Sequence, residues 1–208
     1  MARAGLTGER VAEAAADLAD AVGFENITVS ALARSFGVKD ASLYAHVRNL
    51  QDLRERVALL AAGELADRIA AAVAGRAGKD AMASFANAYR DYALAHPGRY
   101  AATQAVQLDP AVLAQSTVYA RTIELTHAML RAYRLVEPDL TDAGRLLRST
   151  FHGYITLEAN GGFSHSREVQ RSWERALDAL HFLLEHWPSE SIASPGGAGE
   201  DMMPARPV

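Results

Sequence analysis

The chain of 208 residues contains no cysteine. Disulfide bonds, thiolate metal ligands and cysteine nucleophiles are therefore excluded together. No stretch approaches the roughly 18 uninterrupted apolar residues of a membrane-spanning helix. The N-terminus lacks the charged-then-apolar pattern of a secretory signal, because Glu9, Glu13 and Asp17 interrupt it. These absences predict a soluble, cytoplasmic protein.

The motifs that mark common enzymes are also missing. The sequence has no glycine-rich phosphate loop, no His-Glu-x-x-His, no Gly-x-Ser-x-Gly and no carboxylate pair at a telling spacing. His181 and His186 are five residues apart, which places them on different faces of a helix and disfavours a zinc pair. We expect neither an enzyme nor a metal or cofactor site.

Hydrophobic residues make up 50% of the chain, alanine is abundant, and runs of β-branched residues are few. This composition favours helices packed on helices. Apolar residues recur at helical spacing through most of the sequence. We predict an all-α fold of about nine helices and no strand. The expected helices cover residues 7–22, 28–36, 40–47, 50–74, 80–96, 99–106, 109–135, 139–160 and 166–187.

The expected organisation has three parts. Residues 1–49 form a small N-terminal domain, residues 50–187 form a larger helical domain, and residues 188–208 form a disordered tail rich in Pro, Gly, Ser and Ala. No Pro-, Gly- or Ser-rich linker precedes the long helix that begins near Leu50. A continuous helix of this kind would transmit displacement between the two domains.

The segment from Thr28 to Leu53 carries the strongest local pattern. Thr28 suits the N-cap of one short helix. Gly37 can adopt the left-handed conformation that a sharp C-terminal turn needs. Asp40 can cap a second short helix. Two short helices across a glycine-containing turn form the helix-turn-helix unit, whose second helix enters the DNA major groove. The pattern predicts DNA binding.

Residues 7–60 resemble the N-terminal domain of the tetracycline-repressor-like (TetR-like) regulators. The resemblance is ordered and ungapped, through Gly23-Phe24, Thr28-Val29, Leu32-Ala33, Gly37-Val38 and Leu43-Tyr44-Ala45-His46-Val47. It implies a homodimeric transcriptional regulator, most often a repressor, with a C-terminal ligand-binding and dimerisation domain. Phe151-His152-Gly153 resembles the aromatic-His-Gly (WHG-type) signature of a regulatory-domain subgroup of that family.

The DNA face is expected on the second short helix and its surroundings. Residues 39–42 open that helix, where base edges are usually read, and Tyr44 and His46 resemble the family's backbone-contacting pair. The alternative is that Tyr44 merely packs and Ser42 merely caps. The full set of candidates is Thr28, Ser30, Lys39, Asp40, Ala41, Ser42, Tyr44, His46 and Arg48.

Two features bear on DNA affinity. Leu50 stands where the family usually has a Lys that helps to hold a phosphate, and Arg48 or Arg54 could replace it. Residues 1–60 carry seven basic and eight acidic side chains, so no bulk basic field drives non-specific binding. We expect modest non-specific affinity and a reliance on geometry and dimerisation.

The middle helices are expected to surround a small-molecule effector. Apolar walls with a few polar tips are typical of ligand sites, although ordinary core packing is the alternative for each residue. His152 beside Gly153 could instead be structural, with the glycine allowing close helix approach. The candidates are Phe85, Tyr89, Tyr92, Tyr100, Gln104, Tyr119, Ile123, His127, Phe151 and His152.

The last two helices are expected to form the dimer interface. The candidates are Trp173, Leu177, Leu180, His181, Leu184 and Trp187, which provide more large apolar surface than one domain needs. A two-fold dimer would place two recognition helices about 34–36 Å apart on a near-palindromic operator.

We therefore expect a ligand-responsive regulator that binds double-stranded operator DNA as a homodimer, with no membrane partner. One alternative is a helical enzyme or ligand-sequestering module with a vestigial DNA-binding domain. Another is a constitutive architectural DNA-binding protein without an effector.

Overall fold

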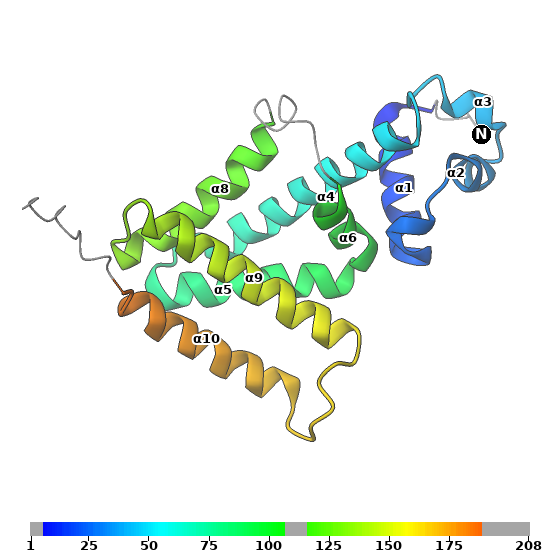
Figure 1. Ribbon diagram of the computed structural model, residues 1–208. Coiled ribbons are helices and arrows are strands. Elements are labelled where there is room, and N and C mark those ends of the chain that lie inside the picture. Colours follow the sequence, from blue (N-terminus) through cyan, green and yellow to red (C-terminus); the bar gives the residue numbers. More distant parts are fainter. Residues whose placement is uncertain (1–5, 107–115, 189–208) are drawn as a thin grey trace, which may run out of the picture.

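The computed structural model describes residues 6–106 and 116–188, and within them all regular structure is helical (Figure 1). Nine α-helices and two 3-10 helices are present in these ranges, which confirms the predicted all-α class. No helix there is long and apolar enough to cross a membrane. The elements are α1 (Gly8–Val22), η1 (Phe24–Asn26), α2 (Val29–Phe36), α3 (Asp40–Leu43), α4 (Leu50–Val73), α5 (Gly78–Ala95), α6 (Pro97–Ala105), α8 (Thr117–Leu130), η2 (Arg131–Tyr133), α9 (Asp139–Ala159) and α10 (Val169–Glu185).

Side-chain caps set the starts of the N-terminal helices. Thr7 Oγ1 accepts a hydrogen bond from the Arg10 amide at 3.2 Å, and Thr28 Oγ1 accepts one from the Ala31 amide at 3.1 Å. Gly37 is left-handed, with φ of 65°, and ends α2 as predicted. Asp40, however, is not a cap. It is the first residue of α3, and its carboxylate accepts a hydrogen bond from the Ser30 hydroxyl instead.

Two hydrophobic cores lie at opposite ends of the molecule (Figure 1). The N-terminal core is formed by α1, α2, α3 and the first half of α4, and the larger core by the second half of α4 with α5, α8, α9 and α10. Leu53, Val57 and Ala58 of α4 belong to the N-terminal core, which thus extends past the boundary expected after residue 49. Helix α4 therefore connects both cores without a break.

Helix α6 also belongs to the N-terminal core, where Ala102 is fully buried. At its start, α6 lies so close to α1 that a Cβ atom on Gly98 would come within 2.1 Å of the Ala19 backbone carbon and oxygen. Only glycine permits this approach. The N-terminal unit is consequently held by two helices of the larger domain rather than by α4 alone.

The C-terminal helices differ from expectation at their ends. The helix start expected at residues 109–110 lies outside the described residues, and α8 stops at Leu130, where η2 follows. Helix α10 begins at Val169 rather than at the expected residue 166, after Glu168 and without a side-chain cap. Of the tail expected from residue 188, residues 189–208 also lie outside the described residues.

Candidate DNA-binding and ligand-binding sites

The helix-turn-helix unit consists of α2, a turn at Gly37 and α3. Leu43 and Val47 are buried in the N-terminal core. The second helix is shorter than the expected 40–47, because α3 ends at Leu43. The amides of His46 and Val47 both donate to the Leu43 carbonyl, at 2.8 and 3.0 Å. This closed turn directs the chain toward the start of α4.

The predicted DNA-face residues lie together around α3 and mostly face solvent. Tyr44 is 54% exposed, so it does not merely pack. Ser42 does not cap α3, which has no side-chain cap. Ser30 and Asp40 bond to each other and tie α2 to α3, whereas His46 is half-buried. The residues with exposed side chains are Thr28, Ser30, Lys39, Asp40, Ala41, Ser42, Tyr44 and Arg48.

A buried carboxylate organises the arginines beside this face. Asp52 accepts hydrogen bonds from the Arg48 amide at 2.9 Å and from Arg48 Nη2 at 3.1 Å, and it lies 3.2 Å from Arg56 Nη2. Burial alone raises the pKa of Asp52, but these contacts outweigh burial and hold the pKa below its ordinary value. Arg54 is engaged elsewhere, stacked on the Phe24 ring. Arg48 remains the more exposed of the two candidates to replace the family lysine.

A pocket of about 450 Å³ lies between α4, α5, α6, α8 and α9. This volume suits a small molecule. Seven of the ten predicted ligand residues line it: Phe85, Tyr89, Gln104, Tyr119, Ile123, His127 and Phe151. The pocket thus brings together residues of four helices that the sequence places up to 66 positions apart.

Tyr100 and His152 do not line this pocket. The Tyr100 hydroxyl lies 2.8 Å from His152 Nδ1 and 3.4 Å from the hydroxyl of Tyr89, which does line it. Burial raises the pKa of the Tyr100 hydroxyl, and the neighbouring Tyr89 adds to the shift. Both side chains therefore support the wall from behind. Gly153 does not serve close packing, because a Cβ there would meet nothing within 4 Å.

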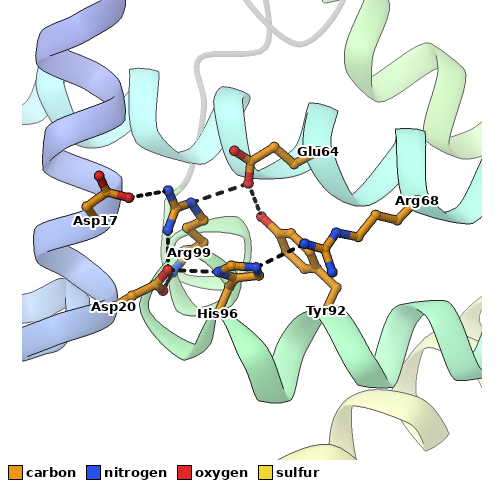
Figure 2. Close-up of polar contacts among 7 residues, drawn as sticks. All are labelled: Asp17, Asp20, Glu64, Arg68, Tyr92, His96 and Arg99. Carbon is orange, nitrogen blue, oxygen red and sulfur yellow. Dashed lines mark hydrogen bonds and ion pairs between the residues drawn. The ribbon is translucent and has the colours of Figure 1, made fainter.

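Tyr92, predicted as a ligand residue, does not line the pocket, because it faces the N-terminal unit instead. Its hydroxyl donates to Glu64 at 2.9 Å, and its ring lies under Arg68 (Figure 2). Burial, followed by the Glu64 carboxylate, raises the pKa of Tyr92. Tyr92 therefore belongs to a polar cluster at the junction between the two cores.

Arg99, near the start of α6, is the centre of that cluster (Figure 2). Its side chain bonds to Asp20 and donates to Asp17 at 2.7 Å, both on α1, and its Nε lies 3.3 Å from Glu64 on α4. The Arg99 amide also donates to Asp20, at 2.8 Å. We call these contacts the Arg99 clasp. The clasp fastens α6 to α1 beside the Gly98 contact.

His96 completes the cluster in a defined tautomer. Its Nδ1 lies 3.1 Å from Asp20 Oδ2, and its Nε2 lies 3.1 Å from Arg68 Nη2. A carboxylate only accepts and a guanidinium only donates, so Nδ1 carries the proton and Nε2 accepts. Through these two contacts, His96 at the C-terminal end of α5 links that helix to α1 and α4.

Comparisons with known proteins match both parts of the chain. Residues 11–57 match the family described as bacterial regulatory proteins, tetR family, and residues 82–180 match the tetracyclin repressor-like C-terminal domain. The uncharacterized HTH-type transcriptional regulator YobS of Bacillus subtilis (strain 168) is 32% identical over 170 residues, which is 82% of this chain and 88% of that protein. The chain belongs to the TetR family of transcriptional regulators.

Two further proteins are similar along most of the chain. The uncharacterized HTH-type regulator Rv0681 of Mycobacterium tuberculosis (strain ATCC 25618 / H37Rv) is 35% identical over 159 residues, which is 75% of this chain and 72% of that protein. The structure of BioQ with its natural double-stranded DNA operator shares the fold, with a TM-score of 0.63 and 23% identity over 88% of this chain and 99% of that one.

The residues expected at the dimer interface of this TetR-family chain require correction. Trp173, Leu177, Leu180 and Leu184 are buried in the larger core of their own subunit, where α10 packs on α5 and α9. The Trp173 indole donates to Asn87 on α5 at 2.7 Å. His181 contacts the Tyr133 hydroxyl at 3.0 Å and Trp187 packs on the same core. The four buried residues therefore offer no free apolar surface, and His181 and Trp187 are only partly exposed.

Sequence reasoning also missed residues of this TetR-family pocket. Leu147 and Arg148 line it from α9, one turn before Phe151. Their spacing of three and four from Phe151 was the available signal, because such residues share a helix face. Arg99 gave no such signal, since its partners on α1 are 79 and 82 positions away.

Proposed function

We propose that the protein is a homodimeric repressor that binds near-palindromic operator DNA and responds to a small molecule in the pocket. Family membership and the exposed helix-turn-helix surface support DNA binding. The single observation that supports ligand response is the position of α6. Its C-terminal part carries Thr103 and Gln104, which line the pocket, and its N-terminal part carries Gly98 and Arg99, which contact α1.

The proposed response follows from that geometry. A ligand that binds Thr103 or Gln104 best when α6 is shifted would hold α6 in that position. The shift would also change the contacts that Gly98 and Arg99 make with α1. The ligand alters DNA affinity only by preferring one placement of the DNA-binding unit over the other. Helix α4, which belongs to both cores, would move with α6.

The dimer interface is proposed on α9 and α10, at apolar side chains that the subunit leaves uncovered. Phe182 is 63% exposed, and Leu157 and Leu183 are also exposed. Large exposed apolar residues commonly mark association surfaces. We also propose membership of the aromatic-His-Gly subgroup, which the bond between His152 and Tyr100 supports as a structural role for that signature.

The test is a selection of operator sequences from random DNA, followed by gel shifts with variants of the DNA face. Each hydrogen bond to a charged phosphate contributes about 1.5–3 kcal/mol, so Tyr44→Ala with His46→Ala should weaken operator binding about a hundredfold or more. Arg76→Ala, at an exposed position just after α4 and outside both proposed surfaces, is the matched control and should bind normally. Unchanged binding by the double variant, or no selected sequence at low salt, would contradict the proposal.

A further inference from the structure

The pocket has charge of one sign only. Two arginines, Arg145 and Arg148, line it from α9 together with His127 from α8. Among the described residues that line the pocket, none is an aspartate or a glutamate. A cationic ligand would be repelled by the arginines, because no carboxylate of the described lining offsets their positive charge.

The two arginines differ in their partners. Arg145 is 77% exposed and pairs with Asp142 at 3.4 Å, so its charge is already balanced in solvent. Arg148 Nη2 instead donates to the neutral Gln104 Oε1 at 3.2 Å, across the pocket mouth from α9 to α6. No carboxylate in the described part of the chain pairs with Arg148. Its guanidinium therefore retains donors for an anionic partner.

The charge of Arg148 extends over the pocket wall. Burial raises the pKa of the Tyr119 hydroxyl, and Arg148 partly opposes that shift. The same opposition acts on Tyr100 behind the wall. The positive charge of Arg148 thus favours the ionised form of both tyrosine hydroxyls.

The buried part of the pocket lining is mostly apolar. It includes Leu65, Phe85, Met129, Leu147 and Phe151, with Tyr89. The hydroxyls of Thr122 and Thr126, which also line the pocket, donate to carbonyls of their own helix, at 3.1 and 3.0 Å. Their donors are already used, so these parts of the lining favour hydrocarbon over a polar group.

We propose that the pocket binds an apolar carboxylate, with its hydrocarbon or aromatic body among the buried side chains and its carboxylate paired with Arg148. This inference rests on the proposed function of the pocket as the effector site. A planar guanidinium matches a carboxylate with two parallel hydrogen bonds. A ligand of this kind would replace the bond between Arg148 and Gln104, which connects it to α6.

Calorimetric titration of the full chain without DNA tests the ligand class. Decanoate and dodecanoate are compared with neutral decanol and cationic decyltrimethylammonium. The third probe, 2-naphthoate, is compared with neutral 2-naphthol. At least one carboxylate should bind about tenfold or more tightly than its analogues, as a charge-assisted hydrogen bond implies. Equal or tighter binding of the neutral or cationic compounds would overturn the proposal, as would no binding of any carboxylate.

Variants assign the contact to Arg148. Arg148→Gln should reduce carboxylate affinity about tenfold or more while leaving the neutral analogue unchanged. Arg148→Lys keeps the charge and should restore part of the loss, which excludes misfolding as the cause. Arg121→Gln is the matched control and should change affinity less than threefold or so, because Arg121 pairs with Asp67 at the surface and does not line the pocket. Equal losses in both glutamine variants would contradict the assignment.

A gel shift separates this inference from the proposed function. If a carboxylate binds but never changes operator affinity, the ligand class stands and the proposed response fails. If a cationic compound binds and releases operator DNA, the response stands and the ligand class is wrong.

Discussion

Replacing Arg99 by Met tests whether the Arg99 clasp holds α6 to the DNA-binding unit. The substitution removes the guanidinium but keeps most of the apolar stem. Arg99 is 11% exposed and Asp20 17%, so their pair is largely shielded from solvent. A hydrogen bond to a charged group contributes about 1.5–3 kcal/mol in such a setting. The contacts with the more exposed Asp17 and Glu64 add at most about 0.5 kcal/mol each.

The expected loss for Arg99→Met is therefore about 2–3 kcal/mol of unfolding free energy. In a chain of this size, that corresponds to a fall of about 4–12 °C in melting temperature. Thermal unfolding followed by circular dichroism measures it. Asp20 retains its bonds from the Arg99 amide and from His96, which keeps the loss below that of an unpaired buried charge.

Arg121→Met is the matched control, because Arg121 pairs with Asp67 at the surface, with 47% and 69% of the side chains exposed. It should shift the melting temperature by at most about 2 °C. Equal shifts in the two variants would show that the clasp contributes no more than a surface ion pair, and the reasoning would fail.

Three further predictions concern packing, pH and assembly. Gly98→Ala should lower the free energy of unfolding, measured with denaturant, by about 1–3 kcal/mol, because its Cβ would overlap the Ala19 backbone. Gly153→Ala should be neutral or stabilising, because nothing lies within 4 Å of its Cβ. Equal changes in unfolding free energy for the two variants would contradict this prediction. Folding lowers the pKa of Asp52 from its unfolded value near 3.8. The ionised Asp52 carboxylate therefore stabilises the fold fully above about pH 3.8, and this stabilisation is lost as the pH falls through the folded-state pKa. Asp52→Asn should therefore lessen the loss of stability on acidification, and an unchanged pH profile would refute the assignment. Phe182→Asp should shift a dimer toward monomer in analytical ultracentrifugation, and an unaltered dimer would exclude that surface.

Local features of the DNA-binding unit could be predicted from sequence. Thr28 as an N-cap and Gly37 as a left-handed helix end depend on a few neighbouring residues, and the structure confirms both. The extent of α3 could not be predicted, because the turn after Leu43 depends on how Leu43 and Val47 are buried by helices elsewhere in the chain.

Sequence periodicity identified apolar helix faces but not what covers them. Trp173 and Leu177 lie on such a face, and the covering helices proved to be α5 and α9 of the same subunit rather than a second copy. Tyr92 likewise shares α5 with Phe85 and Tyr89 but turns toward Glu64. Which side of a helix meets a pocket depends on tertiary placement, and a single sequence does not encode it in local spacing.

The burial of Ala102 in the N-terminal core has a practical consequence for protein engineering. The N-terminal core of this regulator runs through the chain to Ala58 and is completed by α6, which begins 39 positions later at Pro97. A fragment that ends before α6 would therefore expose part of this core. Chimaeras that exchange DNA specificity between relatives should therefore transfer the matching surface of α6 together with the N-terminal unit. Where Gly98 or Ala102 is changed, the residues of α1 that they contact should be changed with them.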